Sequence, residues 1–146
     1  MKSLQYGFFT IVLALALVTR ADAADASYVQ EQNIVYAETG GIGLLMDVFR
    51  PSGESNGLGI VDVASGAWHS DRGKIEDHKQ AQMYDIFCGR GYTVFAIRPG
   101  SRSKFTVNEM VDHLNQGIRY VKAHAAEYGV DPDNLGLTGA SAGAFT

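Results

Sequence analysis

Residues 135–143 read Leu-Gly-Leu-Thr-Gly-Ala-Ser-Ala-Gly, and the rest of the sequence has to support the fold that this stretch indicates. A short strand-like run leads into a glycine-x-serine-x-glycine pattern centred on Ser141. Only small residues flank the serine, as a sharp strand-to-helix turn requires when its backbone atoms approach closely. Such a turn exposes the serine hydroxyl and directs the next amide, that of Ala142, at a developing oxyanion. The pattern predicts a nucleophilic serine; the alternative is an ordinary glycine-rich turn between a strand and a helix.

The sequence before this turn alternates strand-like and helix-like segments. Two β-prone runs, 33–38 and 44–49, flank a glycine-rich turn and predict a hairpin. Further strands are expected at 58–64, 92–97 and 134–138, and helices at 75–90 and 106–128. Strands joined by crossover helices pair in parallel. We therefore expect an α/β fold, with a mostly parallel sheet that starts with an antiparallel β-hairpin.

The helix at 106–128 has the clearest boundaries. Thr106 and Glu109 form a capping box at its start, and apolar residues then recur with the helical period of about 3.6 residues. Gly129 follows as the expected left-handed cap. Asp62, in contrast, interrupts an otherwise apolar strand, and the pattern gives no reason for it.

Residues 1–26 have the features of a secretory signal peptide. Lys2 precedes the apolar run 8–18, and A-x-A cleavage sites end at Ala23 and Ala26. The run is too short to cross about 30 Å of hydrocarbon as a helix, although an uncleaved membrane anchor is the alternative. We expect residues 27–146 to form an exported domain, periplasmic or extracellular, with no stable membrane partner.

The composition is that of a globular protein, with 46% hydrophobic and 19% charged residues. The net charge of −4 argues against nucleic acid as a partner, which would need a clustered basic face. Cys88 is the only cysteine, so no internal disulfide forms, and we expect it to be a small buried apolar residue. Asp71, Asp77 and His78 match no common ligand spacing, and neither a metal nor a cofactor is expected.

Three stretches resemble the α/β-hydrolase superfamily, in particular its exported bacterial esterase and lipase-like branch. Residues 46–51 (MDVFRP) resemble the second strand of that family, and residues 128–143 resemble its approach to the nucleophile almost residue for residue. Residues 64–68 (ASGAW) occupy the place of its oxyanion loop, with Ala64 and Ser65 where the family has a histidine and a first glycine. The resemblance implies the N-terminal half of an α/β-hydrolase fold, truncated just after the nucleophile elbow.

The resemblance also implies roles for individual residues. Ser141 is the implied nucleophile, and the amide of Ala142 is one oxyanion donor. The second donor comes from the Gly66–Ala67 stretch, where backbone N–H groups bind the oxygen. Trp68 is equally consistent with a wall of the acyl pocket and with a core aromatic residue.

The base of such a serine is not evident in the sequence. In this fold the triad runs along the chain as serine, then acid, then histidine, whereas all four histidines precede the serine: His69, His78, His113 and His124. His113 and His124 are expected at solvated helix positions, and His69 is the candidate for a substitute base beside the oxyanion loop. We expect the acid and base to lie beyond Thr146, and the 146-residue chain to be inactive alone.

These observations favour a serine hydrolase of the esterase or lipase-like type that acts on small-molecule carboxylic esters through an acyl-enzyme. Two alternatives stay open. One is a prolyl-oligopeptidase-like serine peptidase of the same fold, which the lack of a propeller-like segment before residue 27 disfavours. The other is a non-catalytic α/β binding module.

Overall fold

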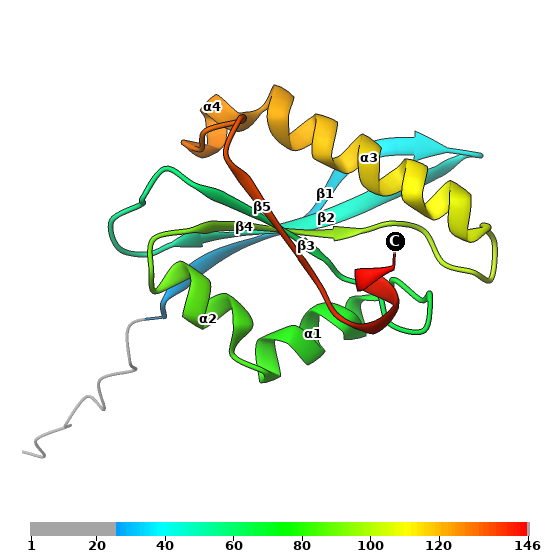
Figure 1. Cartoon of the computed structure of the whole chain (residues 1–146), viewed down its shortest axis with the longest axis horizontal. Helices are drawn as coiled ribbons and strands as arrows, with labels where there is room; N and C mark the ends of the chain where they lie inside the picture. Colours follow the sequence, from blue (N-terminus) through cyan, green and yellow to red (C-terminus); the bar gives the residue numbers. More distant parts are fainter. Residues whose placement is uncertain (1–25, 146) are drawn as a thin grey trace, which may run out of the picture.

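A computed structural model describes residues 26–145 (Figure 1). Apart from Ala26, the predicted signal peptide lies outside the described residues. The strands are β1 Tyr28–Thr39, β2 Ile42–Pro51, β3 Gly59–Val63, β4 Thr93–Arg98 and β5 Leu135–Gly139. The helices are α1 Arg72–Gln80, α2 Met83–Cys88, α3 Val107–Ala123, α4 Ala125–Tyr128 and the 3-10 helix η1 Ser141–Ala144.

The five strands form one mixed sheet in the order β1-β2-β4-β3-β5. β2 pairs antiparallel with both β1 and β4, whereas β3 pairs parallel with β4 and with β5. Gly40 and Gly41 join β1 to β2 with φ angles of +52° and +73°, the two-residue turn whose twist suits a hairpin. The expected antiparallel start followed by parallel strands is confirmed, and β5 lies at an edge of the sheet.

Helices cover both faces of the sheet. In Figure 1, α3 and α4 lie on one side and α1 and α2 on the other. The α3 face holds an apolar cluster that includes Met46, Val61 and Val121, and the opposite face holds one that includes Phe49 and Tyr84. Every residue of β3 is buried, which explains the nearly continuous apolar character of that segment.

The single helix expected at 75–90 is wrong, because α1 and α2 are separate helices. Gln82 breaks them apart with a left-handed φ of +56°. Ile75 and Tyr84 are both fully buried, yet in one continuous helix they would lie about two and a half turns apart, on opposite sides. The break lets both side chains face the sheet, whereas Ile86 in α2 is 49% exposed.

The long helix after β4 begins as predicted. Glu109 N–H donates to the Thr106 hydroxyl at 3.3 Å, and Thr106 N–H donates to the Glu109 carboxylate at 2.7 Å. The helix ends at Ala123, a separate turn α4 follows, and Gly129 has the expected left-handed φ of +65°.

The expectation that His113 is solvated is wrong, because its residue is only 3% exposed. His113 lies three residues after Met110 and four before Gly117, so it shares the helix face that packs on the sheet. Its ring meets the edge of Phe105 with the two centroids 4.6 Å apart. Desolvation lowers the pKa of His113, and the imidazole is therefore neutral at physiological pH.

Candidate active site

Ser141 is the first residue of η1, directly after the tight turn that follows β5. It is exposed and has a left-handed φ of +52°. A residue other than glycine seldom adopts this conformation, and where it does the strain is often part of a functional site. β3, β4 and β5 are parallel, so their carboxyl ends meet at one edge, which is where α/β sheets bind ligands. The turn therefore presents Ser141 at that edge.

The two glycines of the pattern are required by close packing. A Cβ atom on Gly139 would lie 2.5 Å from the carbonyl oxygen of Gly143. A Cβ atom on Gly143 would lie 2.5 Å from the carbonyl oxygen of Val63, at the end of β3. Neither position admits a side chain without a backbone shift, so the spacing of the motif follows from the approach of η1 to β3 and β5.

The loop between β3 and α1 is bonded directly to this turn. Gly143 N–H donates to the carbonyl oxygen of Ser65 at 3.2 Å. The next residue, Gly66, exchanges two backbone hydrogen bonds with His69, both of 2.9 Å, around a turn in which Ala67 and Trp68 have positive φ. The Gly66 amide thus already has an acceptor, whereas the Ala67 amide donates to no group within residues 26–145.

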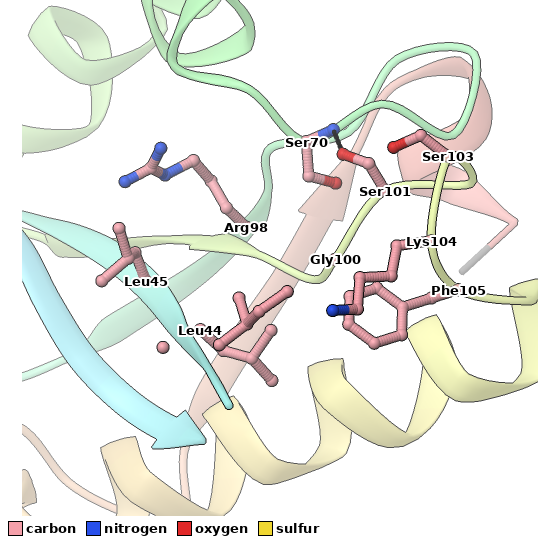
Figure 2. Close-up of a pocket in the computed structure, with 11 residues that line it drawn as sticks. Leu44, Leu45, Ser70, Arg98, Gly100, Ser101, Ser103, Lys104 and Phe105 are labelled. Carbon is pink, nitrogen blue, oxygen red and sulfur yellow. Dashed lines mark hydrogen bonds between the residues drawn. The ribbon is translucent and has the colours of Figure 1, made fainter. Parts of the chain in front are cut away.

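A second loop supports the first. Arg102 N–H donates to the carbonyl oxygen of Trp68 at 2.9 Å, and Ser70 N–H donates to the hydroxyl of Ser101 at 2.9 Å. Figure 2 shows the bond between the two serines. The loops that follow β3 and β4 are therefore joined, and the partly buried Trp68 lies within this junction.

Three of the four histidines either contact a hydrogen-bond partner or are buried in the core. His124 contacts the Tyr120 carbonyl through Nδ1 at 2.8 Å, with the two rings stacked. His78 contacts the Asp62 carboxylate at 2.8 Å, and His113 is buried as described above. His69 is partly buried in the loop that contacts the elbow.

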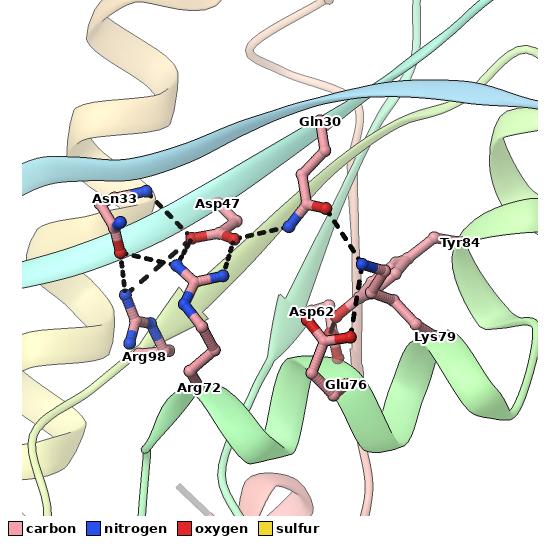
Figure 3. Close-up of polar contacts among 9 residues, drawn as sticks. All are labelled: Gln30, Asn33, Asp47, Asp62, Arg72, Glu76, Lys79, Tyr84 and Arg98. Carbon is pink, nitrogen blue, oxygen red and sulfur yellow. Dashed lines mark hydrogen bonds and ion pairs between the residues drawn. The ribbon is translucent and has the colours of Figure 1, made fainter. Parts of the chain in front are cut away.

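Asp47 is the buried centre of a polar cluster that sequence reasoning missed (Figure 3). Arg72 donates to both of its oxygens, at 2.9 and 3.1 Å. Gln30 and the backbone N–H of Asn33 donate to the same carboxylate, at 2.8 and 3.1 Å, and Arg98 approaches to 3.9 Å. Burial alone raises the pKa of Asp47, but the bonds from Arg72, Asn33 and Gln30 outweigh it, and the pKa lies below its usual value.

Asp62, which the sequence left unexplained, lies in the same row of the sheet, since both aspartates pair with Ala96. Tyr84 donates its hydroxyl to Asp62 at 2.9 Å, beside the contact from His78. The bond to Asp62 raises the pKa of His78, although burial opposes the shift. A buried carboxylate needs hydrogen-bond donors, so an acidic residue in an otherwise apolar strand is the sequence signal that predicts them.

Cys88 is buried as predicted, with Sγ 3.6 Å from the Phe49 carbonyl oxygen, and burial raises the pKa of its thiol to about 12. Within residues 26–145, no helix has the length and apolar character needed to cross a membrane. No group of three metal-binding side chains comes together in the same part of the chain.

The mixed sheet agrees with comparisons to known proteins. A profile of the BD-FAE family matches residues 46–146. The chain belongs to the BD-FAE family. The probable carboxylic ester hydrolase LipM of Mycobacterium tuberculosis (strain ATCC 25618 / H37Rv) is 28% identical over 118 residues, which are 80% of this BD-FAE chain and 27% of LipM.

Solved esterases share the fold of this BD-FAE chain. Thermogutta terrifontis esterase 2 is 27% identical with a TM-score of 0.63, and the match covers 77% of this chain and 40% of that one. Another structure of that esterase is phosphorylated by paraoxon. Esterase B from Lactobacillus rhamnosis is 18% identical with a TM-score of 0.66, covering 80% and 37% of the two chains. The BD-FAE chain thus has a partial α/β-hydrolase fold and spans well under half the length of these relatives.

Proposed function

We propose that Ser141 is the nucleophile of a serine hydrolase that cleaves small-molecule carboxylic esters through an acyl-enzyme. The observation that carries the proposal is the elbow itself: an exposed serine with a φ of +52° between two glycines that admit no side chain. The kinship with ester hydrolases supports the ester as the bond that is cleaved.

The proposed reaction begins with attack of the Ser141 hydroxyl oxygen on the ester carbonyl carbon. The negative charge that develops on the carbonyl oxygen is stabilised by backbone amides, for which we propose Ala142 and Ala67. Of the predicted pair in the β3–α1 loop, Gly66 instead donates to His69 and so holds the turn that carries Ala67. Collapse of the intermediate expels the alcohol, and water then hydrolyses the acyl-enzyme to release the acid.

The proposed base and acid lie outside the described residues. His78 and His124 are bonded to other groups and His113 is buried, which makes each a poor base for Ser141. His69, the candidate substitute base, has no carboxylate bonded to its ring among residues 26–145 that would orient it toward the serine. A serine without a base is a weak nucleophile at neutral pH, so we propose that the 146-residue chain is inactive by itself. Residues 1–26 support the further proposal that the protein is exported.

Replacement of the nucleophile tests this function. In the longest protein that the gene encodes, Ser141→Ala is expected to lower kcat/KM for p-nitrophenyl butyrate by at least about a thousandfold. Paraoxon should label the unmodified protein at Ser141, as detected by peptide mass spectrometry, and should not label the variant. Ser52→Ala, at an exposed serine in the loop after β2, is the matched control and should retain activity.

Two results would favour the alternatives. Faster cleavage of a peptide anilide than of the ester would indicate a serine peptidase of the same fold. A folded protein that neither hydrolyses the ester nor reacts with paraoxon would indicate a non-catalytic binding module.

A further inference from the structure

Beyond the ester chemistry proposed for Ser141, we propose that the cavity between the start of β2 and the loop after β4 binds a small carboxylate that carries an apolar group (Figure 2). The cavity has a volume of about 350 Å³, within the range of small-molecule sites. Ser141 is not among the residues that line it. The proposed site is therefore separate from the Ser141 hydroxyl.

The charges around the cavity have one sign. Lys104 and Arg98 line it, and no acidic residue of the described range 26–145 does, although the chain as a whole carries a net charge of −4. The Arg98 guanidinium is already bonded to Asn33 and lies near Asp47. Lys104 has no carboxylate within ion-pair distance among residues 26–145, and Figure 2 shows its side chain directed toward Leu44. Its ammonium group is the cation available to an anionic ligand.

The serines of the cavity wall supply hydrogen-bond donors. Ser101 accepts the N–H of Ser70 at 2.9 Å, which leaves the hydrogen of the Ser101 hydroxyl free to donate. The Ser70 hydroxyl has no hydrogen-bond partner among residues 26–145, and the residue is 9% exposed. A buried hydroxyl without a partner is costly, and a ligand oxygen at this wall would relieve it. Donors without opposing acceptors fit the oxygens of a carboxylate.

The remaining wall is apolar. Ile42, Leu44 and Leu45 from β2 and the ring of Phe105 also line the cavity. An inorganic anion would leave these side chains in contact with water, whereas an alkyl group would cover them. The combination of one cation, hydroxyl donors and aliphatic walls is complementary to a short-chain carboxylate.

Binding of hexanoate to the 146-residue chain tests the proposal, with fluorescence of Trp68, the single tryptophan, as the readout. Trp68 is suited to report because its carbonyl is bonded to Arg102, in the loop that forms the cavity wall. Since each buried methylene raises affinity by about fourfold, hexanoate should bind at least about tenfold more tightly than acetate. It should also bind more tightly than hexan-1-ol, which has the same chain and no charge.

Variants locate the site. Lys104→Gln should weaken hexanoate binding by about three- to fivefold, the range of an exposed ion pair, and Ser101→Ala should weaken it as well. Lys122→Gln removes the same charge from an exposed position on α3 and should leave binding unchanged. Ser141→Ala should also leave binding unchanged, so the result does not depend on whether the proposed esterase function is correct.

Four outcomes would overturn the proposal. These are equal affinity for hexan-1-ol, equal affinity for acetate or inorganic phosphate, unchanged affinity in Lys104→Gln, and loss of affinity in Ser141→Ala. The last would place the ligand at the elbow instead.

Discussion

Asp47 and Asp62 flank Ala96 in one row of the sheet, and both are fully buried under α1, yet their partners differ. Asp47 receives hydrogen bonds on both oxygens, two of them from the permanently charged guanidinium of Arg72. Within the described part of the chain, Asp62 receives bonds on Oδ2 only, and its Oδ1 has no hydrogen-bond partner.

The comparison shows two kinds of polar interaction that hold a polar helix against an apolar sheet. α1 buries a single apolar side chain, Ile75. The interactions of its polar side chains with Asp47 and Asp62 therefore contribute much of the stability of its packing on the sheet. The guanidinium of Arg72 stays charged at every physiological pH, whereas the imidazole of His78 is charged only when it is protonated. Because α1 follows the loop that is bonded to the elbow, both interactions help to position the candidate active site.

The largest effect is expected from Arg72→Met, which leaves the buried carboxylate of Asp47 without its main counter-charge. We expect the free energy of unfolding in urea at pH 7 to fall by about 3 kcal/mol, at the lower end for a broken buried pair because Arg72 is partly exposed. Arg119→Met, at an exposed arginine of α3, is the control. A loss below about 1 kcal/mol would mean that Gln30 and Arg98 satisfy Asp47 without Arg72.

A smaller effect is expected from Tyr84→Phe. The variant keeps the stacking of the ring on Phe49, with centroids 3.8 Å apart, and removes only the hydroxyl that donates to Asp62. Stability should fall by about 2 kcal/mol, the value for a hydrogen bond to a charged group. Tyr92→Phe, at a partly buried tyrosine, provides the comparison in the same urea titration. Equal losses in the two variants would argue against a special role for the bond to Asp62.

The smallest effect is expected at His78 and depends on pH. The bond to Asp62 raises the pKa of His78 above its ordinary value of 6.5. The stability that this pairing contributes is therefore fully present below about pH 6.5 and is lost as the pH rises through the raised pKa. His78→Gln should cost about 1 kcal/mol at pH 5.5 and less at pH 8.5.

Urea unfolding across this pH range measures the effect, with His69→Gln as the control. A pH dependence that persists unchanged in His78→Gln would assign the titration to another group. The contribution of the Asp47–Arg72 pair to stability should not change over this pH range, because the lowered pKa of Asp47 moves any loss of stability to acid pH.

Much of the fold is readable from local patterns. The hairpin, the capping box at Thr106, the cap at Gly129 and the serine turn all follow from interactions within a few residues, which the sequence displays directly. The break at Gln82 is not readable in this way, because it depends on bringing Ile75 and Tyr84 to the same sheet.

The candidate site likewise combines features that local sequence predicts with features that depend on tertiary contacts. The motif predicts Ser141 as the nucleophile, whereas the hydrogen bonds between Gly66 and His69 and the burial of His113 depend on loops and faces that meet only in the folded chain.

The sequence by itself determined the α/β class, the order of the strands along the chain and the place of the serine elbow, because hydrophobic period, capping residues and small-residue spacing act locally. Only the tertiary structure decided which buried acids have partners, where α1 ends and which loop amide is already bonded. Those features arise between residues far apart in the chain, such as Asp47 with Arg72 and Gly143 with Ser65, whose pairing is fixed by the packing of helices on the sheet.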